Sequence, residues 1–95
     1  MLKDPQIAKI ASAVAKTTLK PKNVIRVMSE PMVDSKGEDA LRITIVIEPD
    51  AVDRITGDAV LNTLVQIQDR LREAGEERFP IVEYATEEDL ASVDD

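Results

Sequence analysis

The amino-acid sequence predicts an α+β fold in which two helices cover one face of a three-stranded sheet, as a two-layer sandwich. Two segments carry apolar residues at helical spacing, and a third alternates between apolar and polar side chains, as a half-buried strand does. The 95 residues, 43% of them apolar and 33% charged, match the size and composition of one domain. We therefore expect residues 1–95 to form a single domain with the element order α-β-β-α-β.

The first predicted helix covers residues 5–19. Asp4 followed by Pro5 is a typical helix start, because the Asp side chain accepts free N–H groups of the first turn and Pro has no N–H to leave unsatisfied. The helix ends at Lys20, since the residue before Pro21 avoids the helical conformation. Its predicted core face consists of Ile7, Ile10, Ala11, Val14 and Thr18.

Two strands are expected next, at residues 23–30 and 41–47. The second strand places alternate aliphatic residues on one face, which must face the core. These residues are Leu41, Ile43, Ile45 and Ile47. Residues 34–37 between the strands have the composition of a tight turn, with Gly37 able to adopt a positive φ, so we expect an antiparallel hairpin with a long connection. Pro31 makes the first strand an edge of the sheet, because it has no N–H to donate.

The second predicted helix begins either near Ala51 or after Thr56, and Gly75 provides its C-terminal stop. Residues spaced by three and four positions define its core face. They are Val60, Leu64, Ile67, Leu71 and Ala74, flanked by Leu61 and Val65.

The C-terminal part of the chain is expected to add a short strand at residues 79–84. Pro80 places this strand at an edge or at a strand start. Thr86 and Asp89 have the spacing of a helix cap, which predicts one last helical turn. Residues 91–95 are expected to form a disordered acidic tail.

The composition excludes several kinds of chemistry. The chain has no cysteine and no histidine, so it has no disulfide, no zinc site with the usual ligands, no thiol nucleophile and no imidazole base. Its longest apolar stretch lies within residues 41–47, far short of the roughly 20 residues that cross a bilayer. We expect a cytoplasmic protein that has neither a membrane anchor nor a leader.

The charge is distributed unevenly along the chain. Residues 1–28 carry six basic residues and one acid, a balance of +5, whereas residues 29–95 carry six basic residues and 18 acids, a balance of −12. The acidic body repels a phosphate backbone, so we do not expect general binding to nucleic acid. It suits a basic protein partner instead.

Residues 24–90 combine a strand, an acid- and glycine-rich loop, a hydrophobic strand, a helix, and a short strand that leads into the Thr-Glu-Glu-Asp-Leu cap of residues 86–90. This skeleton resembles the minimal nucleotidyltransferase domains found beside helical toxin partners in prokaryotic toxin–antitoxin pairs. In that family a Gly-Ser turn precedes a strand with two aspartates one residue apart, which hold magnesium, and a third carboxylate lies on the last strand.

The catalytic motifs of that family are missing from this chain. The strand positions of the paired aspartates hold Arg42 and Thr44, and the nearest candidates for the Gly-Ser turn are residues 29–30 and 35–37. The resemblance therefore implies the family's skeleton without its catalytic centre. We expect no catalytic residue, no bound metal and no cofactor.

We expect a non-catalytic, acidic protein-interaction domain. Its partner is another protein, such as an adjacent gene product for which it serves as an antitoxin-like or regulatory half, or a second copy of itself. Two alternatives stay open. One is a divergent Mg-dependent nucleotidyltransferase-like enzyme using Asp39 and Glu83, and the other is a nucleic-acid accessory protein that acts through its basic first helix.

Two groups of residues are candidates for partner binding. Val24, Met28 and Val46 are expected on the sheet face that the helices leave uncovered, and they are too apolar for full exposure to water. The second group is the basic side of the first helix. Its candidate residues are Lys9, Lys16 and Lys20.

Overall fold

The computed structural model describes residues 1–91, with the element order that the sequence predicts. The helices and strands are α1 (Asp4–Leu19), β1 (Val24–Val33), β2 (Asp39–Ile47), α2 (Gly57–Glu73), β3 (Phe79–Ala85) and α3 (Glu87–Ala91). Of the acidic tail predicted at residues 91–95, Ala91 is the last residue of α3, and residues 92–95 lie outside the described part.

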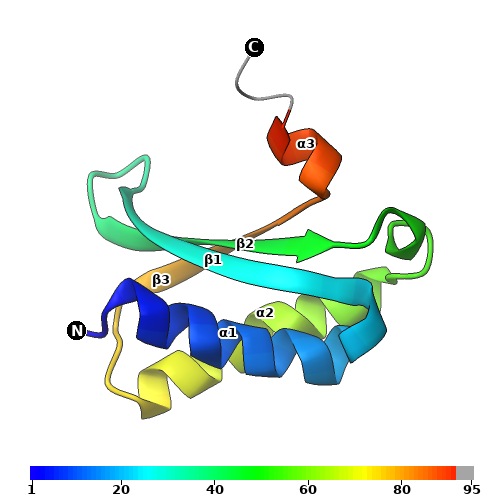
Figure 1. The fold of residues 1–95 in the computed structure, drawn as a ribbon. Coiled ribbons are helices and arrows are strands. Elements are labelled where there is room, and N and C mark those ends of the chain that lie inside the picture. Colours follow the sequence, from blue (N-terminus) through cyan, green and yellow to red (C-terminus); the bar gives the residue numbers. More distant parts are fainter. Residues whose placement is uncertain (92–95) are drawn as a thin grey trace.

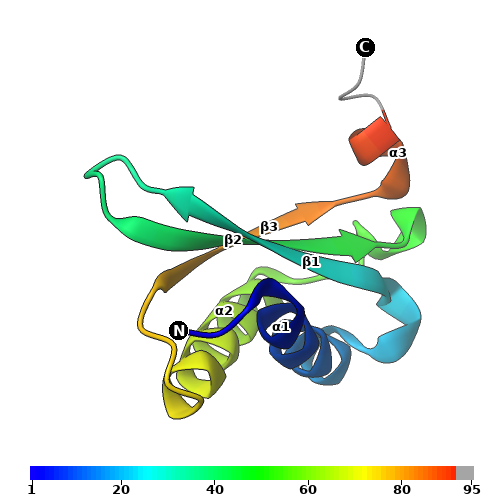
Figure 2. The same cartoon turned by 60° about the vertical axis from the view of Figure 1, so that its left-hand side comes forward.

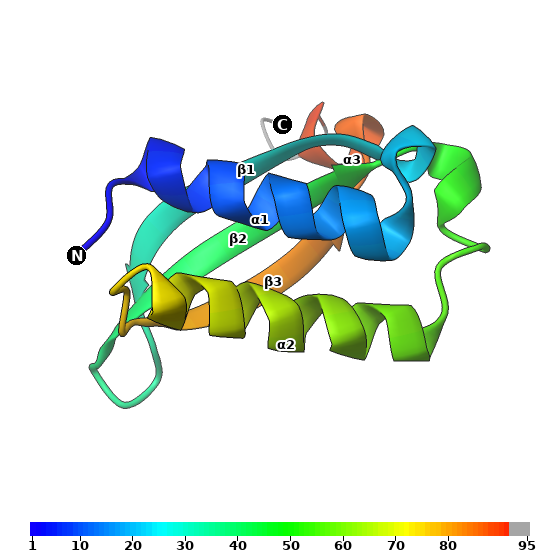
Figure 3. The ribbon, with the colours of Figure 1, turned by 90° about the horizontal axis from the view of Figure 1, so that it is seen from below.

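The three strands form one mixed sheet in the order β1-β2-β3. β1 pairs with β2 in antiparallel orientation, and β3 lies parallel to β2. Helices α1 and α2 lie side by side against one face of this sheet, whereas α3 lies on the opposite side, beyond the end of β3 (Figures 1 and 2). The view from the helix side shows α1 and α2 in front of the strands (Figure 3). The predicted α+β class and the placement of both long helices on one face are confirmed.

The hairpin between β1 and β2 is tighter than predicted. β1 continues through Pro31 to Val33, because a proline is tolerated on an edge strand. At the tip, an Asp34 carboxylate oxygen accepts hydrogen bonds from the backbone N–H groups of Lys36 and Glu38, at 2.8 and 2.9 Å. Gly37 has a φ of +80°, as the predicted turn requires.

The hydrophobic core lies between the helices and the sheet. The predicted inner face of β2 is confirmed, since its four aliphatic side chains are at most 5% exposed. They pack against α1 through Ile7, Ala11 and Val14, and against α2 through Ile67 and Leu71. These contacts come from segments far apart in the sequence, so they hold the two layers together.

Helix α2 begins after Thr56, whose hydroxyl oxygen accepts a hydrogen bond from the Ala59 N–H at 3.1 Å. Part of its predicted core face is wrong. Val60 is 38% exposed and Ala74 is exposed, whereas Thr63 is fully buried. Its hydroxyl donates to the Ala59 carbonyl at 2.7 Å and lies 2.6 Å from the Thr18 hydroxyl of α1. A threonine whose hydroxyl is hydrogen-bonded in this way can be buried in the core. A prediction from hydropathy alone expects an aliphatic residue at such a position.

The limits of the other helices agree with the sequence to within a residue or two. α1 begins at Asp4, and Lys3 rather than Asp4 occupies its N-cap position, where the Lys3 N–H donates to the Gln6 side chain at 3.0 Å. The cap predicted before α3 is confirmed, because Thr86 and Asp89 exchange side-chain to backbone hydrogen bonds of 3.0 and 3.1 Å. Among residues 1–91, no helix is long and apolar enough to span a membrane.

Candidate interaction surfaces

The open face of the sheet, on the side away from α1 and α2, does not gather the three apolar residues predicted for it. An irregularity in β1 between Val24 and Arg26 shifts the alternation of side chains. Val24 therefore pairs with Ile47 and joins the core on the helix side, so its predicted placement is wrong. Val46 is fully buried, and Met28 is half-buried beside Thr44. A partner-binding role for Met28 and Val46 stays a prediction.

The three candidate lysines lie on another side of the molecule. Lys9 and Lys16 are exposed on α1, and Lys20 is exposed directly after it, with a φ of +75°. Because α1 covers the opposite face of the sheet (Figure 1), the structure does not bring these lysines together with Met28. The two predicted groups are therefore separate surfaces.

A groove of about 480 Å³ crosses the open face. All three strands contribute to its floor, and α3 contributes Leu90 to its lining. The lining residues are Met28, Ser29, Glu30, Arg42, Thr44, Glu83, Ala85 and Leu90. The groove thus combines apolar side chains with charged ones, a composition suited to a mixed polar and apolar ligand.

The charges of the open face are arranged around Arg42. Its guanidinium lies 3.2 Å from a carboxylate oxygen of Glu30 on β1 and 3.7 Å from one of Glu83 on β3. Two carboxylates therefore share one guanidinium, so these three residues give the groove a net negative charge. A third ion pair, between Arg26 of β1 and Glu87 of α3 at 2.8 Å, connects α3 to the edge of the sheet.

The carboxylates of the alternative magnesium site are not close together. Asp39 is the first residue of β2, and Glu83 lies beside Thr44, five residues further along that strand. Five strand residues span about 16 Å, so the structure does not bring Asp39 and Glu83 together. Within residues 1–91, no group of three or more acidic side chains is arranged to hold a metal ion.

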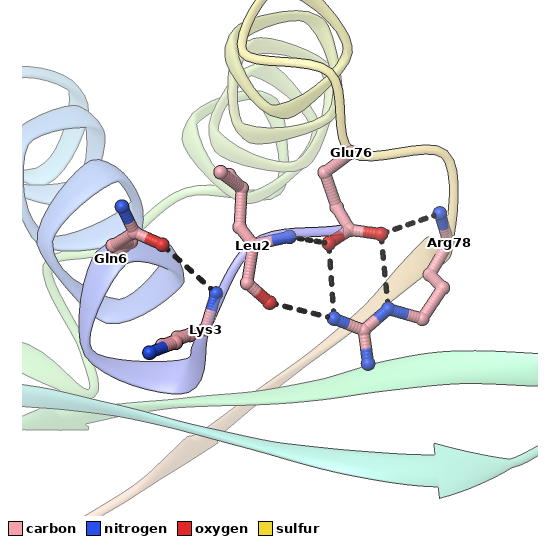
Figure 4. Close-up of polar contacts among 5 residues, drawn as sticks. All are labelled: Leu2, Lys3, Gln6, Glu76 and Arg78. Carbon is pink, nitrogen blue, oxygen red and sulfur yellow. Dashed lines mark hydrogen bonds and ion pairs between the residues drawn. The ribbon is translucent and has the colours of Figure 1, made fainter.

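A buried ion pair anchors the N-terminal segment. Glu76, which is 2% exposed, accepts two hydrogen bonds from the Arg78 guanidinium, at 2.9 and 3.0 Å. Its carboxylate also accepts the backbone N–H groups of Leu2 and Arg78, and Arg78 donates to the Leu2 carbonyl at 3.1 Å (Figure 4). Hydrogen bonds from Arg78 lower the pKa of Glu76 from 4.5 to about 2, although burial opposes the shift.

Helix α2 exposes aliphatic side chains that the sequence analysis placed beside its core face. Leu61 is 61% exposed and Val65 is 46% exposed, and they lie one turn apart on the same side of the helix. Polar residues are typical of the water-facing side of a helix. This surface is a third candidate for contact with another molecule.

A smaller pocket of about 320 Å³ lies where β2 and β3 end, next to the start of α2. Ile47, Ile55, Val60 and Tyr84 supply most of its apolar wall. Burial raises the pKa of the Tyr84 hydroxyl, because a phenolate is poorly solvated in such surroundings.

No protein-family model matches this chain, and neither a curated protein nor a solved structure matches it.

Proposed function

We propose that this protein is a non-catalytic interaction domain that binds a basic segment of another protein in the groove on its open sheet face. The observation that carries the proposal is the groove itself, which crosses all three strands and is bordered by α3. The strands of this face are hydrogen-bonded to one another and have α1 and α2 packed behind them, so they form a platform that is ordered before binding. Recognition on such a platform costs little ordering of the binding surface.

The chemistry of the groove indicates the kind of segment that fits. Met28 and Leu90 offer apolar contacts, while Glu30 and Glu83 share Arg42 as their cation. Lysine or arginine side chains of a partner would compensate the remaining negative charge. An apolar side chain between them would occupy the middle of the groove.

The product of an adjacent gene is the partner that the resemblance to toxin–antitoxin nucleotidyltransferase domains favours. In that case this protein is the antitoxin-like or regulatory half of a prokaryotic gene pair, with its site of action in the cytoplasm. Arg42 and Thr44, which the resemblance aligns with that family's paired aspartates, lie in the groove. The proposal therefore assigns to binding the surface that those enzymes use for catalysis.

The test is complex formation with the adjacent gene product, measured by size-exclusion chromatography with light scattering. Wild-type protein is expected to form a complex. Thr44→Lys should weaken it by roughly tenfold or more, because the new side chain fills the groove and removes its acidic excess. Ser35→Lys adds the same charge at the exposed hairpin tip and should leave binding unchanged.

Two results would contradict the proposal. One is the absence of any complex with the wild-type protein. The other is equal binding by the Thr44→Lys and Ser35→Lys variants, since the partner would then contact a different surface.

A further inference from the structure

The exposed side of α2 carries a regular stripe of residues. Its members are spaced by three and four positions, so at 100° per residue they fall within an arc of about 80°. They are Asp58, Leu61, Val65, Gln68 and Arg72. Val65 occupies the middle of the stripe with Leu61 and Gln68 on either side of it, and opposite charges mark its two ends.

The two charged ends have no ion-pair partner within residues 1–91. Asp58 and Arg72 are both exposed, and neither belongs to an ion pair formed in the described part of the chain. Asp58 precedes Val65 by seven residues, and Arg72 follows Val65 by seven. The stripe is therefore complementary in charge to an inverted copy of itself.

We infer that two copies of this chain associate through α2, with the helices antiparallel about a two-fold axis at Val65. This arrangement places Asp58 of each copy beside Arg72 of the other. The Val65 side chains of the two copies meet at the axis, and Leu61 of each copy packs beside Val65 and Gln68 of the other, between the charged ends. The interface is separate from the groove on the open face, so this inference goes beyond the proposed function.

The aliphatic part of the interface is tested by sedimentation equilibrium on the full chain. Wild-type protein is expected to be a dimer that dissociates on dilution. Changing Leu61→Ser and Val65→Ser together should raise the dissociation constant by at least roughly tenfold. Val33→Ser is the matched control, because Val33 on β1 has the same 61% exposure as Leu61. This variant should leave the dissociation constant of the dimer unchanged.

The geometry of the interface is tested by exchanging its charges. Asp58→Arg alone should weaken the dimer, because it places two arginines together at each end. Asp58→Arg combined with Arg72→Asp should restore the wild-type dissociation constant, since each end again pairs opposite charges. If the variant with both changes dimerised no more tightly than Asp58→Arg alone, the antiparallel arrangement would be wrong.

A crosslink reports which residues of the two copies lie close together in the dimer. The chain has no cysteine, so Val65→Cys introduces a single thiol beside the axis, which should form an intermolecular disulfide under mild oxidation. Arg72→Cys should crosslink poorly, because the two copies of that residue lie at opposite ends of the interface.

The outcomes separate this inference from the proposed function. A wild-type monomer at all concentrations that still binds the adjacent gene product would overturn the α2 dimer alone. A dimer that binds no other protein would overturn the proposed function alone.

Discussion

At the scale of single residues, Glu76 is a buried carboxylate, with 2% of its surface exposed. A buried carboxylate is strongly unfavourable unless it is paired and hydrogen-bonded. Here Arg78 supplies the opposite charge, and two backbone N–H groups complete the shell of donors. Through Leu2, the pair joins the N-terminal segment to the turn before β3, so its contribution is to tertiary structure.

The pH dependence of stability should reveal this pair. The folded pKa of about 2 lies below the ordinary value of 4.5, so the stabilisation is fully present above pH 4.5 and is lost as the pH falls towards 2. It amounts to roughly 3 kcal/mol. Urea unfolding should therefore show Glu76→Gln to be less stable than wild type by about this amount at pH 7, with a difference that shrinks between pH 5 and pH 2.

Glu77→Gln is the matched control, because Glu77 is the exposed neighbour of Glu76. Its stability should follow that of wild type across the same pH range. A Glu76→Gln deficit that is independent of pH would show that the carboxylate charge is not what stabilises the N-terminal segment.

At the scale of elements, two glycines at opposite ends of α2 differ in backbone conformation. Gly75, after the helix, has a φ of +92°, whereas Gly57, its first residue, has no positive φ. A Cβ at either position would meet no atom within 4 Å. Space is therefore equal at the two sites, and only the backbone conformation distinguishes them.

The same substitution should consequently have opposite effects. Gly75→Ala should destabilise the protein by about 1 kcal/mol, because a side chain disfavours positive φ. Gly57→Ala should stabilise it by about 0.5 kcal/mol, since it restricts the unfolded chain without strain. Thermal unfolding measures whether each variant is more or less stable than wild type. If both variants were destabilised by the same amount, this explanation would be contradicted.

The elements themselves could be predicted because their signals are local. Helical spacing, strand alternation and the boundaries at Pro21, Gly37 and Gly75 all act within a few residues, and the order and approximate limits of the elements that they predict agree with the structure. The buried side of α2 was less predictable. Thr63 lies in the core because Thr18, which is 45 residues away in the sequence, faces its hydroxyl, and no local pattern contains that information.

The candidate surfaces were harder to predict than the fold. One extra residue in β1 moves Val24 to the helix side, and a strand irregularity of this kind has no composition that marks it. The ion pairs around Arg42 depend on the register of the three strands. Glu76 and Arg78 are only two residues apart, but their contacts with Leu2 form only when the N-terminal segment folds against the turn before β3. By contrast, the spacing of Leu61 and Val65 is visible in the sequence, but the rotation of α2 decides whether they face the core.

At the scale of the whole molecule, the two-layer architecture places the open-face groove and the exposed stripe of α2 on different sides. The helices cover one face of the sheet and α3 lies at the other (Figure 2), so the open-face groove and the exposed stripe of α2 can be occupied independently. An α2 dimer leaves both grooves free. The dimer would then present two equivalent binding sites, which increases the apparent affinity for a partner that is itself dimeric.

NMR can map where another protein binds on the open sheet face. The measurement is the change in amide chemical shifts of isotope-labelled protein during titration with the adjacent gene product. We predict that the largest changes fall on Met28, Thr44, Glu83 and Leu90, which belong to all three strands and α3. Changes confined to the lysine side of α1, or the absence of any change at saturating partner, would contradict it.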